Sequence, residues 1–364
     1  MRYQGGTTLR GELVSANGSS ALIQTAFSSA LIEASLQGVE ALILDATPGE
    51  RESAGKGLDQ LFTQVGMVRG QLIFDHRADP FGWRPEGGIA TVRLAETGGM
   101  RIERSSKHRG EGHVMGGGLY PDRVHLRNGD VFPAKALAFD SLSIRLESPF
   151  FSAQTLHADA LKGVEFAGWK DFDEAEEERR AKAWEEGIGG TVASLPVRGR
   201  SGSLDRALLV PRAFRQTPST HIVQAKNGDM RRGTLRSFDA STLEFESRFK
   251  PTRIPRQLVV RIVDVRPEVG AHDSRQGEGG NDSFGVAIQG IRTVMSDGSV
   301  ITFFPQSADD QMLYGHASVY GEVKLPLRGI SEITLGDFEF ERFEEKFGAW
   351  NSLPAPEPQY DERH

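Results

Sequence analysis

The sequence has no cysteine among its 364 residues. Disulfides, thiolate metal sites, cysteine nucleophiles and thiol redox chemistry are therefore excluded within these residues. It also lacks any apolar run of about 18 residues, the length that a membrane-spanning helix needs. No apolar segment of the signal-peptide type follows Met1. The sequence thus predicts no transmembrane segment and no chemistry that depends on a thiol.

Motifs for catalysis and metal binding are missing as well. The nine histidines form no His-x-x-x-His or His-Glu-x-x-His pair, and there is no Gly-x-Ser-x-Gly nucleophile motif. The stretch Pro48–Gly57 is no phosphate-binding loop, because five residues separate Gly49 from Gly55 and Gly57 stands where that motif needs a hydroxyl group. We predict that the protein is not an enzyme and has no catalytic residue, metal ligand or cofactor.

Positive charge is in deficit. The 43 Lys and Arg residues against 50 Asp and Glu residues give a net charge of −7 at pH 7. A general nucleic-acid-binding protein usually carries a clear basic excess or a basic stripe. A nucleic-acid partner is therefore not expected.

What the sequence does contain is an internal repeat. The segment His221–Pro267 holds five short runs in which apolar and polar residues alternate, which is the period of β-strands. An Asn-Gly pair between the first two runs predicts a tight hairpin turn whose two central residues both have positive φ. The same features occur 99 positions earlier, in the pairs Asn128 and Asn227, Gly129 and Gly228, Asp130 and Asp229, Asp140 and Asp239, and Glu147 and Glu246.

Two further copies of the repeat can be placed. Gly6 aligns with Gly228 at the N-terminus, and Asp297 and Gly298 mark a hairpin turn near the C-terminus. The first copy has only Met1–Gln4 for its first strand, so we expect the sequence to be shortened at this end or to begin at a start codon placed too late, which would hide a signal peptide. Because Asp140 and Asp239 recur at one repeat position, we expect them to form turns rather than to catalyse a reaction.

These observations predict an all-β protein of tandem five-stranded barrels or half-barrels, stacked edge to edge so that exposed strands pair. A short charged helix is expected as a connector, because acidic residues precede basic ones by three or four positions in 171–186. The predicted order is β-repeat 1 (1–47), a divergent β segment with a Gly-rich connector (48–118), repeat 2 (119–168), the charged helical connector (169–207), repeat 3 (208–267), a disordered insertion (268–285), repeat 4 (286–336), and an aromatic and acidic cap over repeat 4 with a Pro-rich tail (337–364).

The order of motifs in repeat 3 carries a resemblance. The Asn-Gly-Asp hairpin at 227–229, the strand ending in Phe238 and Asp239, the Leu-Glu-Phe-Glu-Ser strand at 243–247 and the Ile-Pro pair at 254–255 together resemble a small SH3-like barrel with the Sm-like order. The whole chain resembles β-repeat regions of bacterial extracytoplasmic proteins, some of which continue through a Trp-x-x-x-x-Ala-Pro-Glu-Pro-like linker into a thioredoxin-like (redoxin) domain. The segment 350–358 matches that linker.

The resemblance implies a non-enzymatic scaffold or protein-interaction module of the bacterial cell envelope, periplasmic or secreted. Its partner would be a protein or another envelope component, and a tethered thioredoxin-like domain would lie outside this sequence. The family's RNA-contacting residues cannot be placed on this chain.

Four aromatic residues suggest an alternative function. Phe81, Trp83, Trp169 and Trp184 could line a face that binds carbohydrate or another surface polymer, since flat rings stack on sugars. The favoured interpretation is that they fill gaps between adjoining β units. An Sm-like RNA binder is the second alternative. No residue pattern identifies the partner.

Overall fold

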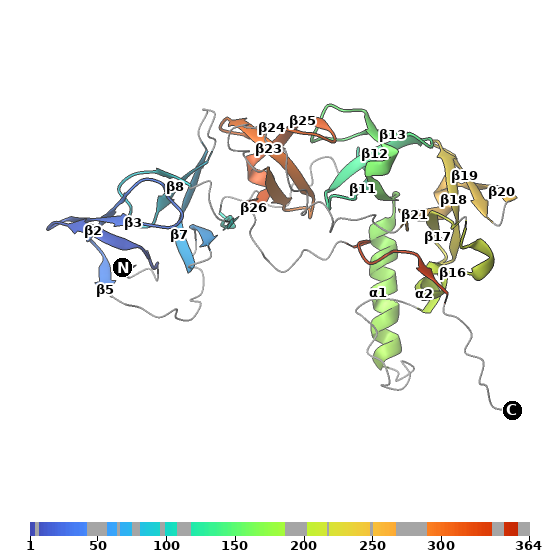
Figure 1. The fold of residues 1–364 in the computed structure, drawn as a ribbon, viewed down its shortest axis with the longest axis horizontal. Helices are drawn as coiled ribbons and strands as arrows, with labels where there is room; N and C mark the ends of the chain where they lie inside the picture. The colour runs from blue at the N-terminus through green and yellow to red at the C-terminus, as the bar shows by residue number, and fades with distance from the viewer. Residues whose placement is uncertain are drawn as a thin grey trace, which may run out of the picture. The chain divides into compact units, whose positions relative to one another are not determined.

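The computed structural model describes residues 1–3, 7–41, 57–63, 66–74, 81–94, 99–107, 118–185, 202–216, 218–247, 250–266, 290–336 and 346–355. The chain divides into two compact units. Unit 1 comprises Met1–Met115, Phe150–Ala153 and Ser283–Phe343, and unit 2 comprises Gly116–Pro149, Gln154–Asp282 and Glu344–His364. Strands dominate both units and pair almost entirely antiparallel (Figure 1). The prediction of an all-β protein is confirmed in this coarse form.

Unit 2 contains two copies of one strand order, a five-strand meander with a short 3₁₀ helix before the fifth strand. Repeat 2 consists of β11 (Asp122–Leu126), β12 (Val131–Phe139), β13 (Ser143–Glu147), β14 (Thr155–His157), the 3₁₀ helix η1 (Ala158–Ala160) and β15 (Leu161–Glu165). Repeat 3 consists of β17 (His221–Ala225), β18 (Met230–Phe238), β19 (Thr242–Ser247), β20 (Lys250–Pro255), η3 (Arg256–Leu258) and β21 (Val259–Asp264). In both repeats the fifth strand returns to pair with the first.

Unit 1 holds the same strand order in repeat 4, and a related order in its N-terminal part. Repeat 4 consists of β22 (Ile291–Met295), β23 (Val300–Ala308), β24 (Met312–Ala317), β25 (Gly321–Pro326), η5 (Leu327–Gly329) and β26 (Ile330–Leu335). The N-terminal strands are β1 (Arg2–Tyr3), β2 (Glu12–Ala16), β3 (Ser20–Gln24), β4 (Ile32–Ser35), β5 (Val39–Ala41), β6 (Asp59–Thr63), β7 (Gly66–Phe74), β8 (Phe81–Pro85), β9 (Val92–Arg93) and β10 (Met100–Glu103). Because β10 pairs with β6, the divergent segment also joins its last strand to its first.

The hairpin turns differ from the predicted geometry. Leu126 N–H donates to Asp130 O over 2.8 Å and Gly129 N–H donates to Leu126 O over 3.2 Å, so the loop has three residues. The glycine, at φ 85°, follows the turn instead of forming its centre. The predicted two-residue turn is therefore wrong. Repeats 3 and 4 make the same pair of bonds, with Gly228 at φ 88° and Gly298 at φ 79°.

Side chains explain why this turn reads Asn-Gly-Asp. Asn128 Nδ2 donates to Asp130 Oδ2 over 2.8 Å, and Asp130 N–H donates back to Asn128 Oδ1 over 3.1 Å. Asn227 and Asp229 repeat both bonds at the same distances. In repeat 4, Asp297 Oδ1 accepts from Ser299 N–H over 2.9 Å. The motif thus stabilises the turn through local hydrogen bonds.

The aspartates of the Phe-Asp motif form a second set of turns. Asp140 Oδ1 accepts the N–H groups of Leu142 and Ser143, each over 2.8 Å, and Asp239 Oδ1 does the same two and three residues on. These hydrogen bonds lower the pKa of both aspartates. Asn17 and Asp309 make equivalent bonds, so four copies of this turn occur in the described chain.

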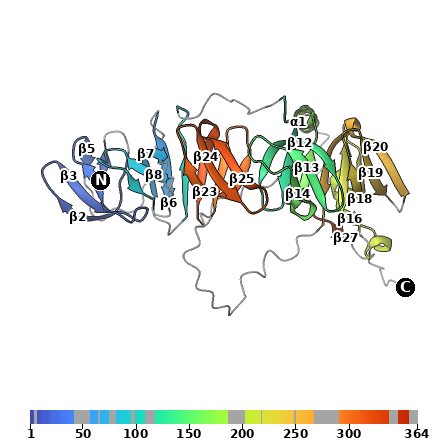
Figure 2. The ribbon, with the colours of Figure 1, turned by 90° about the horizontal axis from the view of Figure 1, so that it is seen from above.

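The repeats within each unit are joined through their fifth strands. In unit 2, β15 pairs with β21 around Val164 and Ile262, and in unit 1, β10 pairs with β26 around Ile102 and Ile333. All four central side chains are at most 3% exposed. Burial of such a side chain contributes about 1.5–3 kcal/mol, and pairing removes an open sheet edge. Figure 2 shows β12–β14 beside β18–β20 within unit 2.

The helices and the described C-terminal residues pack within unit 2. Helix α1 (Trp169–Glu185) falls in the predicted charged connector and buries Phe172. Helix α2 (Gly202–Leu208) is followed by β16 (Leu209–Val210), which pairs in parallel with β27 (Leu353–Pro354). Phe347 lies 1% exposed in a cluster with residues of α2, β17 and β21. The described part of the predicted cap, residues 346–355, therefore belongs to unit 2, whereas repeat 4 belongs to unit 1.

Other predicted segments lie outside the described residues. They include the loop at 48–56, most of the Gly-rich connector, the insertion at 268–285, and the end of the tail from 356.

Gly233, on the second strand of repeat 3, allows the third strand β19 to approach closely. A Cβ on Gly233 would lie 2.3 Å from Glu246 O and 2.5 Å from the Phe245 ring. Gly11 and Gly70 have the same crowding, against the Ile23 and Trp83 side chains. A side chain at this position would displace the buried residue of the third strand.

We therefore expect Gly233→Ala to lower the free energy of unfolding by about 1–3 kcal/mol, because overpacking shifts both strands. Urea unfolding monitored by circular dichroism measures the change. Gly18→Ala is the matched control, since nothing lies within 4 Å of its added methyl group. Equal stability of the two variants would contradict the packing argument.

Candidate functional site

The aromatic residues considered for carbohydrate binding do not form one exposed surface. Trp83 is 0% exposed and Phe81 is 5% exposed, with the Phe81 ring 5.9 Å from the ring of Phe74 in an edge contact. Both side chains therefore fill the interior of the β6–β10 segment in unit 1. A buried ring offers no face on which a sugar could stack.

Trp169 has a different environment, in unit 2. Trp169 is the first residue of helix α1, and its side chain is half-buried. Arg123 Cζ lies 5.1 Å and Lys346 Nζ 5.0 Å from the centroid of its ring. These cation–π contacts occupy the ring and help to fix the helix. The side chain of Trp184 lies outside the described part of the structure.

A pseudo-two-fold relation organises the joint of unit 2, by which we mean the contact between repeats 2 and 3. Phe139 and Phe238 hold the same repeat position, pair across β12 and β18, and stack with ring centroids 5.7 Å apart. The fifth strands pair symmetrically as well, since Gly163 faces Val263 and Glu165 faces Arg261 around Val164 and Ile262. The joint therefore has two equivalent sides.

Arg256 fills one side of the joint. Its guanidinium donates to Asp122 Oδ2 over 2.7 Å and to Ala136 O over 2.7 Å. It also lies over the Phe166 ring at 4.4 Å and the Phe238 ring at 5.6 Å. We call this place the Arg256 slot. It is a planar, apolar space closed by a carboxylate.

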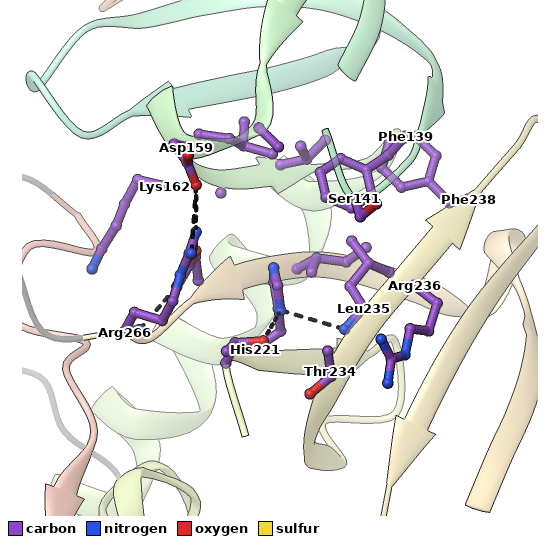
Figure 3. A pocket seen from close by; sticks show the side chains of 17 residues that line it. Phe139, Ser141, Asp159, Lys162, His221, Thr234, Leu235, Arg236, Phe238 and Arg266 are labelled. Atoms are coloured by element: carbon purple, nitrogen blue, oxygen red, sulfur yellow. Dashed lines mark hydrogen bonds and ion pairs between the residues drawn. The ribbon is translucent and has the colours of Figure 1, made fainter. Parts of the chain in front are cut away.

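The equivalent place on the other side is a cavity. Arg256 N–H donates to Ser241 O and Ala158 N–H donates to Leu142 O, both over 2.8 Å, so Ala158 holds the position of Arg256 in repeat 2. Alanine has no side chain beyond Cβ. A cavity of about 170 Å³ remains, and its lining includes Phe139, Ala158, His221, Leu235, Phe238 and Asp264 (Figure 3).

His221 replaces Asp122 in this second place. Leu235 N–H donates to His221 Nδ1 over 3.3 Å, just as Ala136 N–H donates to Asp122 Oδ2 over 2.9 Å. Thr220 Oγ1 also lies 2.7 Å from Nδ1. Because Nδ1 accepts, the neutral ring carries its proton on Nε2, which points into the cavity (Figure 3).

His221 is neutral at pH 7. Burial lowers its pKa to about 4; the negative charge of Asp264 opposes this shift, while the positive charges of Arg266 and Arg127 add to it. Asp264 itself is engaged by Arg127, 2.8 Å away, and by Arg266 Nε, 2.8 Å away. The cavity therefore presents a neutral N–H donor beside a carboxylate that is already paired.

Five charged side chains line the cavity, and each has a partner within the protein. The basic ones are Lys162, Arg236 and Arg266, and the acidic ones are Asp159 and Asp264. Lys162 Nζ donates to Trp350 O and Asn351 Oδ1, over 3.3 Å and 3.2 Å. Arg236, on the rim, pairs with Glu246 at 2.6 Å.

A second polar cluster lies on the other face of the joint, below helix α1. Glu165 is 0% exposed and accepts from His125 Nε2 over 2.9 Å and from Lys346 Nζ over 2.7 Å, with Arg261 3.4 Å away. Arg261 and Lys346 also bind Asp173 of helix α1. One buried carboxylate thus connects repeat 2, repeat 3, the helix and the C-terminal segment.

The lowered pKa values of Glu165 and His125 make this cluster more stable at neutral pH than in acid. Burial opposes ionisation of Glu165, but the hydrogen bond from His125 and the charges of His125, Lys346 and Arg261 outweigh it and hold the pKa at about 2. Burial lowers the pKa of His125 more than Glu165 raises it. The arrangement stabilises the joint. Within the described residues no group of three or more His, Asp or Glu side chains could hold a metal.

Acid should weaken this cluster. Because the pKa of Glu165 is lower in the folded protein than its ordinary 4.5, its stabilisation is complete above pH 4.5 and is lost as the pH falls towards 2. The shift corresponds to on the order of 3 kcal/mol. The lowered pKa of His125 acts in the same direction below about pH 6.5.

We expect hydrogen exchange of the β15 amides, corrected for intrinsic exchange, to accelerate as the pH falls from 4.5 to 2. Glu165→Gln should raise their exchange at pH 7 and flatten the dependence between pH 4.5 and 2. Glu147→Gln is the control, because that half-exposed carboxylate lies 3.8 Å from Lys135 at the surface. An unchanged pH dependence in Glu165→Gln would show that other groups control the acid response.

Comparisons with known proteins add no family. No protein-family model matches the sequence, and a search of curated proteins gives no significant match.

Sequence reasoning missed Arg256, Ala158 and His221. Repeats 2 and 3 keep a 99-residue offset up to Glu147 and Glu246, but Ala158 and Arg256 are 98 residues apart. This one-residue deletion precedes the 3₁₀ helix and hides the equivalence. The observable signal was that Asp122 in repeat 2 corresponds to His221 in repeat 3, at the first position of the first strand.

Proposed function

We propose that the chain is a non-enzymatic scaffold made of small SH3/Sm-like barrels, and that it docks a protein partner of the bacterial cell envelope. The strand order supports the barrel assignment, because repeats 2, 3 and 4 each have four strands, a 3₁₀ helix and a fifth strand that returns to the first. The envelope location and a tethered thioredoxin-like domain rest on the sequence resemblance alone.

The observation that carries the proposal is the fifth-strand pairing. It occurs in both units around the same repeat position, with Val164 opposite Ile262 and Ile102 opposite Ile333. Polar residues that recur among the repeats are engaged in turns, as Asp140 and Asp239 are. Copies that use their shared residues to hold one another together suit a framework better than a reaction.

Exposed apolar side chains are the candidate contacts for a partner. Leu142 is 70% exposed at the turn between β12 and β13, where repeat 3 has Ser241 and repeat 4 has Gln311. Since this tip is polar in two other copies, Leu142 is the position at which a contact specific to repeat 2 can be tested. Lys135, on β12 of the same repeat, provides an exposed polar position for comparison.

A photo-crosslinking amino acid placed at Leu142 in the full chain tests the proposal in cells that express it. We expect one reproducible protein adduct from position 142. At equal expression of the two variants, this adduct should be at least tenfold stronger from position 142 than from position 135. Saturable glycan binding, or RNA binding that weakens steeply with salt, in the absence of a protein adduct would favour the carbohydrate or RNA alternative instead.

A further inference from the structure

We propose that the cavity in the joint of unit 2 binds a small planar carboxylate of about the size of benzoate. This activity would be separate from scaffolding. It would arise because one side of the joint is filled by Arg256 whereas the other side, at Ala158, is a cavity.

The size of the cavity sets the size of the ligand. Its volume is about 170 Å³. An engineered apolar cavity of about 150 Å³ in another protein takes up benzene, so one six-membered ring with a small substituent fits this space. A sugar chain or a nucleotide does not.

The shape follows from the Arg256 slot. There, a planar guanidinium lies 4.4 Å from one phenylalanine ring and 5.6 Å from another. The cavity keeps the repeat partner of the second ring, Phe139, which stacks on Phe238 with an angle of 14° between the planes. The nearer ring, Phe166, corresponds to Asp264, so one wall of the cavity has a carboxylate in place of a ring. The rings of Phe139 and Phe238 line the cavity, as do the aliphatic side chains of Leu161, Val164, Leu235 and Ile262. A flat, mainly apolar group is therefore favoured.

The polar group at the inner end selects an acceptor. Asp122 closes the Arg256 slot and pairs with a cation, whereas His221 stands in that position here and turns a ring N–H into the cavity. A guanidinium or ammonium group would meet a donor where it needs an acceptor. A carboxylate oxygen accepts from this N–H, and a buried donor that gains a charged acceptor contributes more than one that gains a neutral partner.

The nearby charges agree with an anion. Asp264 lies on the strand opposite His221, but Arg127 and Arg266 already engage it. Arg266 also lies 3.5 Å from Asp159. The charge of Asp264 is therefore compensated within the protein, and the N–H of His221 can donate to an anion.

Calorimetric titration of the full chain with benzoate tests the proposal. We expect saturable binding with a dissociation constant of about 1 mM or tighter, in keeping with the affinity per atom of small ligands. Benzylamine, which has the same ring and the opposite charge, should bind at least tenfold more weakly.

Substitution of Ala158 identifies the site. Ala158→Arg places in the cavity the side chain that fills the other side of the joint, and Ala158→Met fills it without adding charge; each should weaken benzoate binding at least tenfold. Leu119→Arg adds the same positive charge at a position of unit 2 that is 73% exposed, and should leave binding unchanged. Circular dichroism confirms that each variant is folded, and Ala158→Met serves if the arginine variant is not.

Three results would overturn the proposal. They are the absence of any heat of binding at about 10 mM benzoate, equal affinities for benzylamine and benzoate, and an unchanged affinity for benzoate in folded Ala158→Met.

Discussion

Antiparallel pairing between the fifth strands of neighbouring repeats is the interaction on which both units depend. A meander of five short strands leaves backbone N–H and C=O groups open along its last strand. In unit 2, β21 supplies partners for that edge of β15, and in unit 1, β26 does so for β10. Since the central residues are aliphatic and buried, one contact satisfies the backbone and removes apolar surface from water.

The symmetry of this pairing gives the rest of the joint two equivalent sides. Two copies of one repeat related by a pseudo-two-fold axis present every side-chain position twice, so a residue that fits on one side has an equivalent on the other. Arg256 closes its side with a carboxylate and two aromatic rings, whereas Ala158 leaves its side open beside His221. Because the copies lie in one chain, the two sides can differ, which identical subunits would not allow.

The buried charges fix how the non-repeated elements attach. Glu165, Arg261 and Lys346 form an ion cluster that only the complete joint encloses, and Asp173 extends it to helix α1. A buried carboxylate is costly unless it is paired, and this one has two cations and a histidine. The helix and the C-terminal segment thus attach at the point where the two repeats meet.

The repeat turns could be read from the sequence because their interactions are local. Asn128 and Asp130 bond to each other within one turn, and Asp140 bonds to residues two and three positions away. Even here the hydrogen-bond pattern needed the structure, since Asn-Gly fits both a two-residue turn and the three-residue turn that is observed. The burial of Phe81 and Trp83 could not be read, because a ring that fills a core and a ring that binds a ligand look alike in composition.

The sequence by itself determined the strand period, the repeated turns and the absence of thiol chemistry, since each depends on residues close together in the chain or on composition alone. Only the tertiary structure decided which strands of different repeats pair, and therefore that Arg256 reaches Asp122 across 134 positions while Ala158 leaves a cavity beside His221. Such contacts depend on how two folded copies face each other, and a one-residue deletion between the copies was enough to hide them from sequence alignment.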